Sequence, residues 1–193
     1  GFGERGGRIR IEAAQICVAA SATGTPALLL RSKVPDPSRT TGRSLHLHPS
    51  VVAAGEFADP VTAWRGVPQT YECTEHLRFG DEEGAHRSWI VPAFAHPVGT
   101  ATMLPGLGVA HAELMSRYAN FAVFTAMLHD RSRGTVTPSG ATGVDIDYWP
   151  DAADRDELRF GLLACAKLLF AAGARRVVLP TFPLRIVERA SDL

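Results

Sequence analysis

Small residues that lead into a helix start, in the stretch 19–32, form the part of this sequence best suited to hold a ligand. An apolar run, Ile16-Cys17-Val18, precedes it and predicts a buried strand. Ala20, Ser21 and Ala22 then allow a tight turn and a close approach to the backbone. In α/β units a turn of this kind, between a strand and a helix, often contacts a cofactor phosphate or ribose. A turn that contacts only protein has the same pattern, and spacing alone leaves both interpretations open.

Two histidines could ligate a metal. His46 and His48 are two residues apart, so on a strand their side chains would share a face. Metal sites need three or four protein ligands, however, and the sequence places no third ligand nearby before Pro49 ends the pattern. We expect no metal site and interpret this segment as a polar loop.

Residues 1–6, Gly-Phe-Gly-Glu-Arg-Gly, match the dinucleotide fingerprint G-x-G-x-x-G. That fingerprint binds pyrophosphate only where a strand precedes it and a helix follows it, because amides at the helix N-terminus face the phosphates. Here an alternating pattern typical of a strand follows, at residues 8–12. We therefore expect a hairpin turn rather than a nucleotide site.

Phe94 and His96 are the candidate pocket residues. In the run 89–97 they share a strand face with Ile90, while Trp89 and Val91 lie on the opposite face. One face must pack on helices, and the other is free to line a pocket. A general base needs a carboxylate partner or a substrate within reach. The sequence places neither beside His96, so we predict a pocket wall or edge residue, and we name no catalytic residue.

The hydrophobic pattern predicts an α+β fold, with a mainly antiparallel sheet backed by helices. A charged turn at 80–84 separates two of the predicted strands. The strands are expected at 8–12, 14–20, 49–57, 67–73, 89–95 and 121–128, with a hairpin formed by 134–137 and 143–148. Helices are expected at 26–32 (after Thr25 as N-cap), at 109–118 and at 152–172, the last closed by Gly173.

Charge and cysteine usage limit the function classes. The chain has 20 basic and 20 acidic residues, well mixed and without a basic stripe, so we expect no nucleic-acid partner. Three widely spaced cysteines form neither a metal spacing nor a disulfide framework, which favours a reducing, cytoplasmic location. No membrane span is predicted. The chain starts without methionine and ends soon after a strand-like run at 177–179, so we expect a segment of a longer protein.

Two motifs resemble the second signature of the glucose–methanol–choline (GMC) flavin oxidoreductases. That signature is written A-G-A-x-x-[ST]-P-x-L-L-x-x-S-G, followed by G-x-N-L-x-x-H. Residues 19–32 are similar to the first part and residues 42–49 to the second, with His48 at its histidine. This chain has Ser21 and Lys33 where the family has glycine, and Ser44 where it has asparagine. The run Asp130–Val136 resembles the S-R-G-x-V strand of GMC substrate domains. The likeness extends from about residue 8 to residue 185.

The resemblance implies a division of the chain. Residues 1–45 would be the C-terminal part of an FAD-binding α/β domain, with a strand–turn–helix and a crossover loop. Residues 46–180 would be the substrate-binding domain, and 181–193 the start of the return to the FAD domain. The family's ADP-binding unit would precede this segment, and its catalytic histidine would follow residue 190.

The resemblance also implies an activity. GMC enzymes, here most like bacterial alcohol-oxidising members, transfer a hydride from a CH–OH carbon of an alcohol to the flavin of FAD, with a histidine as base. The cofactor contacts of this segment would be Ala20, Ser21 and Ala22, and we expect it to be inactive in isolation. Two other hypotheses stay open: a truncated, non-catalytic remnant, and a stand-alone α+β module that binds a hydrophobic ligand.

Overall fold

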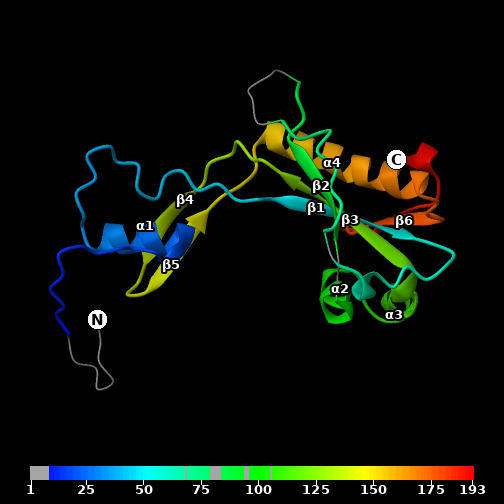
Figure 1. Ribbon diagram of the computed structural model, residues 1–193, viewed down its shortest axis with the longest axis horizontal. Helices are drawn as coiled ribbons and strands as arrows, with labels where there is room; N and C mark the ends of the chain where they lie inside the picture. The colour runs from blue at the N-terminus through cyan, green and yellow to red at the C-terminus, as the bar shows by residue number, and fades with distance from the viewer. Residues whose placement is uncertain (1–8, 68, 79–83, 94–95, 105) are drawn as a thin grey trace. The chain divides into compact units, whose positions relative to one another are not determined.

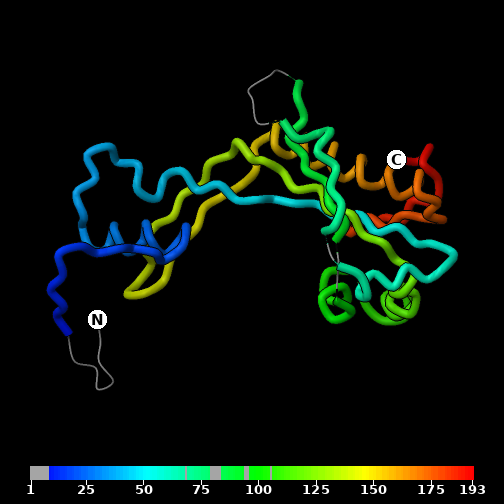
Figure 2. Tube along the Cα trace, in the orientation of Figure 1, coloured from blue at the N-terminus to red at the C-terminus, as the bar shows by residue number. Residues whose placement is uncertain are grey.

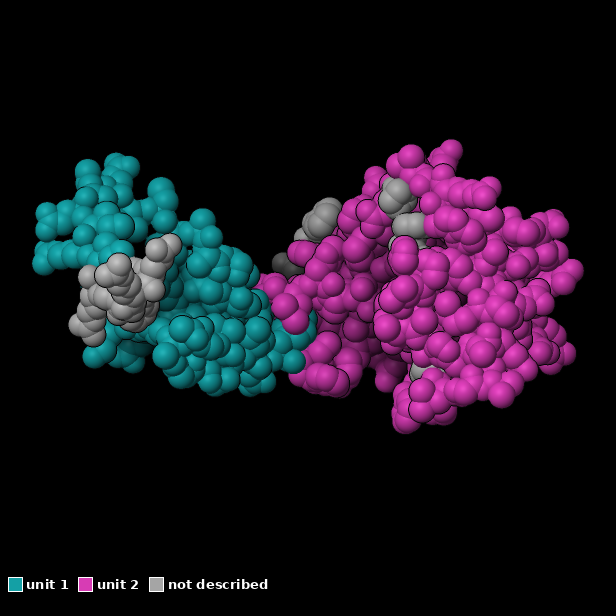
Figure 3. Space-filling model, turned by 90° about the horizontal axis from the view of Figure 1, so that it is seen from below, with its two compact units in different colours: residues 1–45, 133–148 teal, residues 46–132, 149–193 magenta. Residues whose placement is uncertain are grey.

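The computed structural model describes residues 9–67, 69–78, 84–93, 96–104 and 106–193. It combines helices with antiparallel sheets and so confirms the α+β class (Figure 1). The chain divides into two compact units, drawn in different colours in Figure 3. The first comprises Gly1–Leu45 and Arg133–Tyr148, and the second His46–Ser132 and Trp149–Leu193.

The second unit is built on a five-stranded sheet with the order β2-β3-β1-β6-β7, in which every neighbouring pair is antiparallel. Its strands are β1 (Ser50–Glu56), β2 (Ser88–Ala93), β3 (Phe121–Leu128), β6 (Arg176–Leu179) and β7 (Arg185–Val187). The helix α4 (Ala152–Ala171) lies along one face of this sheet (Figures 1 and 2).

The core of this unit lies between α4 and the sheet. Ala53 and Ile90 from the sheet pack with Cys165 and Leu169 from the helix, and all four are buried. Gly161 brings the two layers close, because a Cβ at this position would lie 2.7 Å from the Cβ of Ala126. Burial of this apolar surface is the main favourable contribution to the stability of the unit.

Both ends of α4 are capped as its sequence predicts. Asp151 is the N-cap, and its carboxylate accepts a hydrogen bond from the Asp154 amide at 2.8 Å. At the other end Gly173 has a φ of +96°. The amides of Gly173 and Ala174 then donate to the carbonyls of Phe170 and Leu169, which is a Schellman motif.

Short helices cover the opposite face of the sheet. They are η1 (Ala63–Arg65), α2 (Pro97–Met103), α3 (Val109–Ser116) and η2 (Tyr118–Asn120). An imidazole nitrogen of His111 on α3 lies 2.9 Å from the Ala101 carbonyl oxygen on α2, so the two helices are tied together. No helix within the described residues is long and apolar enough to cross a bilayer.

The first unit is small. Its helix α1 (Ser21–Arg31) lies against the hairpin of β4 (Thr135–Ser139) and β5 (Gly143–Asp147), as Figure 2 shows. The guanidinium of Arg31 donates to the carbonyl oxygens of Ser139 and Gly143 and so connects the helix to both strands.

Several predicted elements are corrected by the structure. Residues 14–20 are not a strand, and neither are the described parts of 8–12 and 67–73. The helix predicted at 26–32 spans Ser21–Arg31, so Thr25 lies inside it instead of capping it. The turn predicted at 1–6 lies outside the described residues, and so does the turn predicted at 80–84 except for Gly84.

The hairpin also differs from its predicted place. It forms a separate two-stranded sheet in the first unit, whereas the sequence placed it in the sheet of the substrate domain. At the C-terminus, β7 and η3 (Ala190–Asp192) belong to the second unit.

Candidate functional site

The turn predicted to contact a cofactor lies at the start of α1. Ala20, Ser21 and Ala22 are all exposed, and Ser21 has a φ of +70°. The Ala20 amide donates to the Thr25 hydroxyl at 3.0 Å. The backbone here therefore turns in the left-handed region that glycine adopts at low cost.

The Ser21 side chain folds back onto the same turn. Its Oγ accepts long contacts of 3.4 Å from the amides of Thr23 and Gly24. Three small exposed side chains leave room for one edge of a large ligand, and they fit the cofactor to that extent. They offer only part of the surface that a ligand the size of FAD needs.

A small pocket lies on the sheet face opposite α4. Its volume is about 30 Å³, and its lining is almost entirely apolar. It is lined by Ala54, Ala63, Trp64, Ala93, Thr100, Leu104, Tyr118, Phe121, Val123 and Val178. The rings of Trp64 and Tyr118 stack with their centroids 5.1 Å apart and their planes 17° apart. Burial raises the pKa of Tyr118, and the neighbouring Thr100 hydroxyl opposes this increase.

His96, one of the two predicted pocket residues, is not among the described residues that line this pocket. His96 is the exposed N-cap of α2, where its Nδ1 accepts from the Val98 amide at 3.4 Å. Phe94 lies outside the described residues. Sequence reasoning missed Trp64 and Tyr118, which are too far apart in the chain for a local pattern to pair them.

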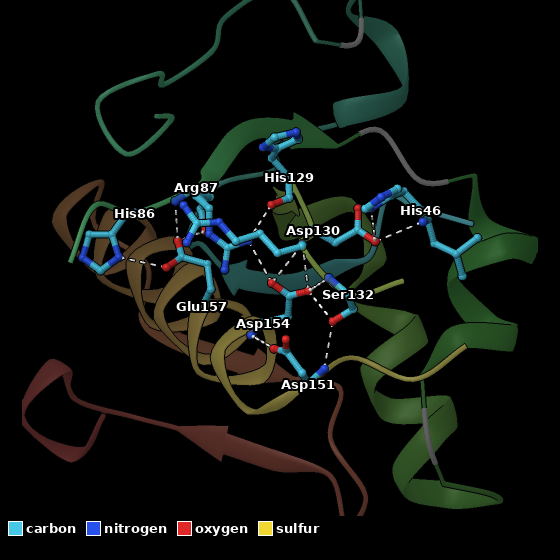
Figure 4. Close-up of polar contacts among 12 residues, drawn as sticks. His46, His86, Arg87, His129, Asp130, Ser132, Asp151, Asp154 and Glu157 are labelled. Atoms are coloured by element: carbon cyan, nitrogen blue, oxygen red, sulfur yellow. Dashed lines mark hydrogen bonds and ion pairs between the residues drawn. The ribbon is translucent and has the colours of Figure 1, made fainter. Parts of the chain in front are cut away.

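A network of buried polar groups holds the N-terminal half of α4 to the sheet (Figure 4). Asp154 is fully buried and accepts from the Arg87 guanidinium at 2.8 Å and from the Ser132 hydroxyl at 2.5 Å. Glu157 accepts from the Ser88 hydroxyl at 2.7 Å and lies 3.1 Å from Nδ1 of His86.

The pKa values of both carboxylates in this network are lowered. Burial alone would raise the pKa of Asp154, but hydrogen bonds from Ser132, Arg87 and Arg131 outweigh it. At Glu157 burial is outweighed in the same way, chiefly by the Arg87 amide and the Ser88 hydroxyl. A carboxylate with a low pKa and saturated oxygens is a poor general base, so we interpret the network as structural.

The two histidines of the metal hypothesis are not joined by further ligands. His46 lies beside the same network, with Nδ1 3.9 Å from an Asp130 oxygen that also accepts from the Leu47 amide at 3.0 Å (Figure 4). Within the part of the chain that the structure describes, no group of three or more His, Cys, Asp or Glu residues is placed to bind a metal.

No protein-family model matches the sequence, but several curated proteins do. An uncharacterized GMC-type oxidoreductase of Mycobacterium tuberculosis is 39% identical over 84% of this chain. A long-chain-alcohol oxidase of Arabidopsis thaliana is 31% identical over 88% of it. An uncharacterized GMC-type oxidoreductase of Sinorhizobium fredii is 28% identical over 91% of it.

The chain covers only part of each of these relatives. It spans 25% of the mycobacterial protein, 22% of the Arabidopsis oxidase and 33% of the Sinorhizobium protein. By this similarity the chain belongs to the glucose–methanol–choline (GMC) family of oxidoreductases.

Proposed function

We propose that the protein containing this stretch is an FAD-dependent oxidoreductase that acts on the CH–OH group of an alcohol. The observation that carries the proposal is the similarity along 84–91% of the chain to GMC-type oxidoreductases and long-chain-alcohol oxidases. The Arabidopsis relatives favour a long-chain alcohol as the substrate.

The two units would contribute different parts of this function. Ala20, Ser21 and Ala22 would contact one edge of the FAD, through small side chains and exposed backbone. When bound, FAD would accept the two electrons that an alcohol loses on oxidation to a carbonyl compound. The five-stranded sheet would form a rigid wall for the substrate, because α4 and its polar network fix one face of it.

The direct test is made on the longer protein. It should purify with a flavin absorption spectrum, and anaerobic addition of a long-chain alcohol should bleach that spectrum. A protein that binds no flavin, or whose flavin no alcohol reduces, would contradict the proposal.

The isolated 193-residue chain, in contrast to the longer protein, should not bind FAD appreciably. The contact of these residues with FAD is too small to hold the cofactor. A fluorescence titration should therefore show no saturation below about 100 μM FAD, which corresponds to a binding free energy of about 5.5 kcal/mol. Saturation at low micromolar FAD would reveal a further cofactor site within these residues and would contradict this expectation.

The apolar pocket favours a second candidate, a module that binds a hydrophobic ligand without catalysis. A longer protein that binds long-chain alcohols but contains no flavin would support this candidate against the first.

A further inference from the structure

The floor of the apolar pocket is shaped by one small residue. Ala54 on β1 stands directly between Val123 on β3 and Val178 on β6 in the sheet register. The two valines rise on either side of the alanine methyl and leave a depression between them. All three residues line the pocket. A larger side chain at position 54 would fill it.

The walls come from the helices above this face. Thr100 and Leu104 belong to α2 and to its C-cap, and the stacked pair of Trp64 and Tyr118 belongs to η1 and η2. Among the described residues, the lining contains no Asp, Glu, Lys, Arg or His. Its polar side chains are Thr100 and Tyr118, and the rest of the lining is apolar. An ion or a phosphate would lose its hydration there without gaining a charged partner, so the chemistry favours an uncharged, largely apolar group.

The size of the pocket determines how much of a ligand enters. A volume of about 30 Å³ is far below the few hundred cubic ångströms of a site for a whole ligand. It has room for about two groups the size of water or methylene. The pocket therefore suits the end of a hydrocarbon chain.

The surroundings suit the rest of such a chain. A wider hollow of about 260 Å³ lies along β1 and reaches both faces of the sheet. It is lined by Val52, two residues before Ala54 on the same face of β1, by Met103 of α2, and on the α4 side by Val51 and Leu162. Residues 97–112 contain no Asp, Glu, Lys or Arg. Exposed apolar side chains of this segment are Val98, Met103, Leu107 and Val109.

We propose that the pocket around Ala54 and Trp64 binds the methyl end of the hydrocarbon chain of an alcohol substrate. The rest of the hydrocarbon chain then extends along β1 toward Val52 and Met103. This inference rests on the proposed function for the identity of the ligand. It adds the position at which the methyl end of the substrate binds, and therefore the part of the protein that selects substrates by the length of their hydrocarbon chain.

Tryptophan fluorescence tests this directly, without flavin or turnover. The chain has three tryptophans, and replacing Trp89 and Trp149 by phenylalanine leaves Trp64 as the reporter. The probe is dodecanol with a bromine on its terminal carbon, because bromine quenches tryptophan at contact. We expect saturable quenching, with affinity falling about fourfold for each methylene removed from the chain.

Two controls test the orientation and the place of binding. An isomer with bromine beside the hydroxyl-bearing carbon should compete with the first probe but should quench little. Ala54→Leu should weaken the quenching at least tenfold. Ala153→Leu adds the same carbons to an exposed position of α4, which lies on the other face of the sheet, and should leave the quenching unchanged.

Ala93→Leu gives a second way to fill the pocket, from the edge strand β2, if Ala54→Leu fails to fold by circular dichroism. Equal quenching by both isomers, or full quenching in a folded, filled variant, would overturn the proposal, as would quenching that never saturates. If such a result accompanied flavin bleaching by dodecanol in the longer protein, the proposed function would stand and only this binding site would be wrong.

Discussion

Ser21 and Lys33 stand at the two ends of α1, and both have positive φ values, +70° and +52°. They are also the two positions where the GMC signature has glycine and this chain does not. The glycines of the signature therefore have a backbone explanation, because L-residues other than glycine adopt this region only at a cost. At Lys33 the geometry is a Schellman motif, in which the amides of Lys33 and Val34 donate to the carbonyls of Leu30 and Leu29.

Lys33→Gly should raise the free energy of unfolding of the first unit by about 1 kcal/mol, because glycine relieves the strain of the left-handed conformation. Urea denaturation followed by circular dichroism measures this change. The control is Ser32→Gly, one residue earlier, where φ is −76° and glycine should cost about 0.5 kcal/mol. Equal effects at both positions would contradict the strain argument.

Ser21→Gly should raise the flavin content of the longer protein. Glycine adopts the same φ without strain and removes a side chain from the face that would approach the cofactor, and the contacts it loses are long ones of 3.4 Å. The ratio of flavin to protein absorbance after purification is the measurement. Ala22→Gly, inside α1, should bring no increase. Unchanged or lower occupancy in Ser21→Gly would mean that the serine is accommodated.

Among the elements, α4 and the sheet are in close contact at Gly161, where there is no side chain to separate them. Gly161→Ala should lower the free energy of unfolding by about 1–3 kcal/mol, although alanine is the better helix former, because its Cβ would overlap that of Ala126. Gly99→Ala in α2 is the matched control. Outside its own turn of helix, no atom of the described residues lies within 4 Å of the Cβ it would add, so this variant should be as stable as the wild type or more stable. Thermal unfolding of both variants separates the packing effect from helix propensity.

The polar network at α4 predicts acid sensitivity. The pKa values of Asp154 and Glu157 are lowered by folding, so their contribution to stability is complete above the unfolded values of 3.8 and 4.5. It decreases as the pH falls below these values, since the unfolded chain then binds protons that the folded chain does not.

Urea titrations between neutral pH and about pH 3 should show this decrease in wild-type stability. Glu157→Gln should be less stable at neutral pH and should show a shallower decrease. The same substitution at the exposed Glu113 should leave the wild-type curve unchanged. An identical pH dependence in Glu157→Gln would contradict the role of this carboxylate.

The sequence predicted correctly those helices and strands whose formation depends on residues within the element itself. Strands 121–128 and 50–56 follow alternating or apolar runs, and α4 carries both of its caps in its own sequence. The strand predicted at 14–20 failed because a strand also needs a partner for its backbone groups. No described strand pairs with it, and Ile16 is 79% exposed. Helix α2 was missed although His96 and Pro97 form a recognisable start, an N-cap followed by proline at the first position.

Only the part of the candidate site that comes from one continuous segment could be predicted from the sequence. The turn at Ala20–Ala22 was predicted from its small residues, and the positive φ of Ser21 agrees with the glycine of the family motif. Its contact with a cofactor stays a prediction. The pocket was not predictable, because Ala54, Trp64 and Val178 come from distant segments that only the completed sheet brings together.

At the scale of the whole molecule, the two units differ in how much they bury. Within the described residues of the first unit, the buried hydrophobic side chains are Ala27, Leu45 and Val136. The second unit has a continuous core between α4 and the sheet. A unit with so small a core opens at a low free-energy cost.

Hydrogen exchange in the 193-residue chain should therefore show faster exchange of amides in α1, β4 and β5 than in β1, β3 and α4. Mass spectrometry of peptic fragments measures this difference. Equal protection in both units would mean that they unfold together and would contradict the separation.

The sheet order also governs how this protein is made. Strand β1 lies between β3 and β6. In the pairing of β1 with β6, Glu56 lies opposite Arg176, which comes 120 residues later in the chain. On the ribosome β1 can pair with β3 early, but its second edge has no partner until nearly the whole stretch has been synthesised. During that interval an apolar, unpaired strand edge is exposed, which is the condition for chaperone capture or aggregation. The vulnerable period of this protein is thus its own translation, and it ends when β6 emerges.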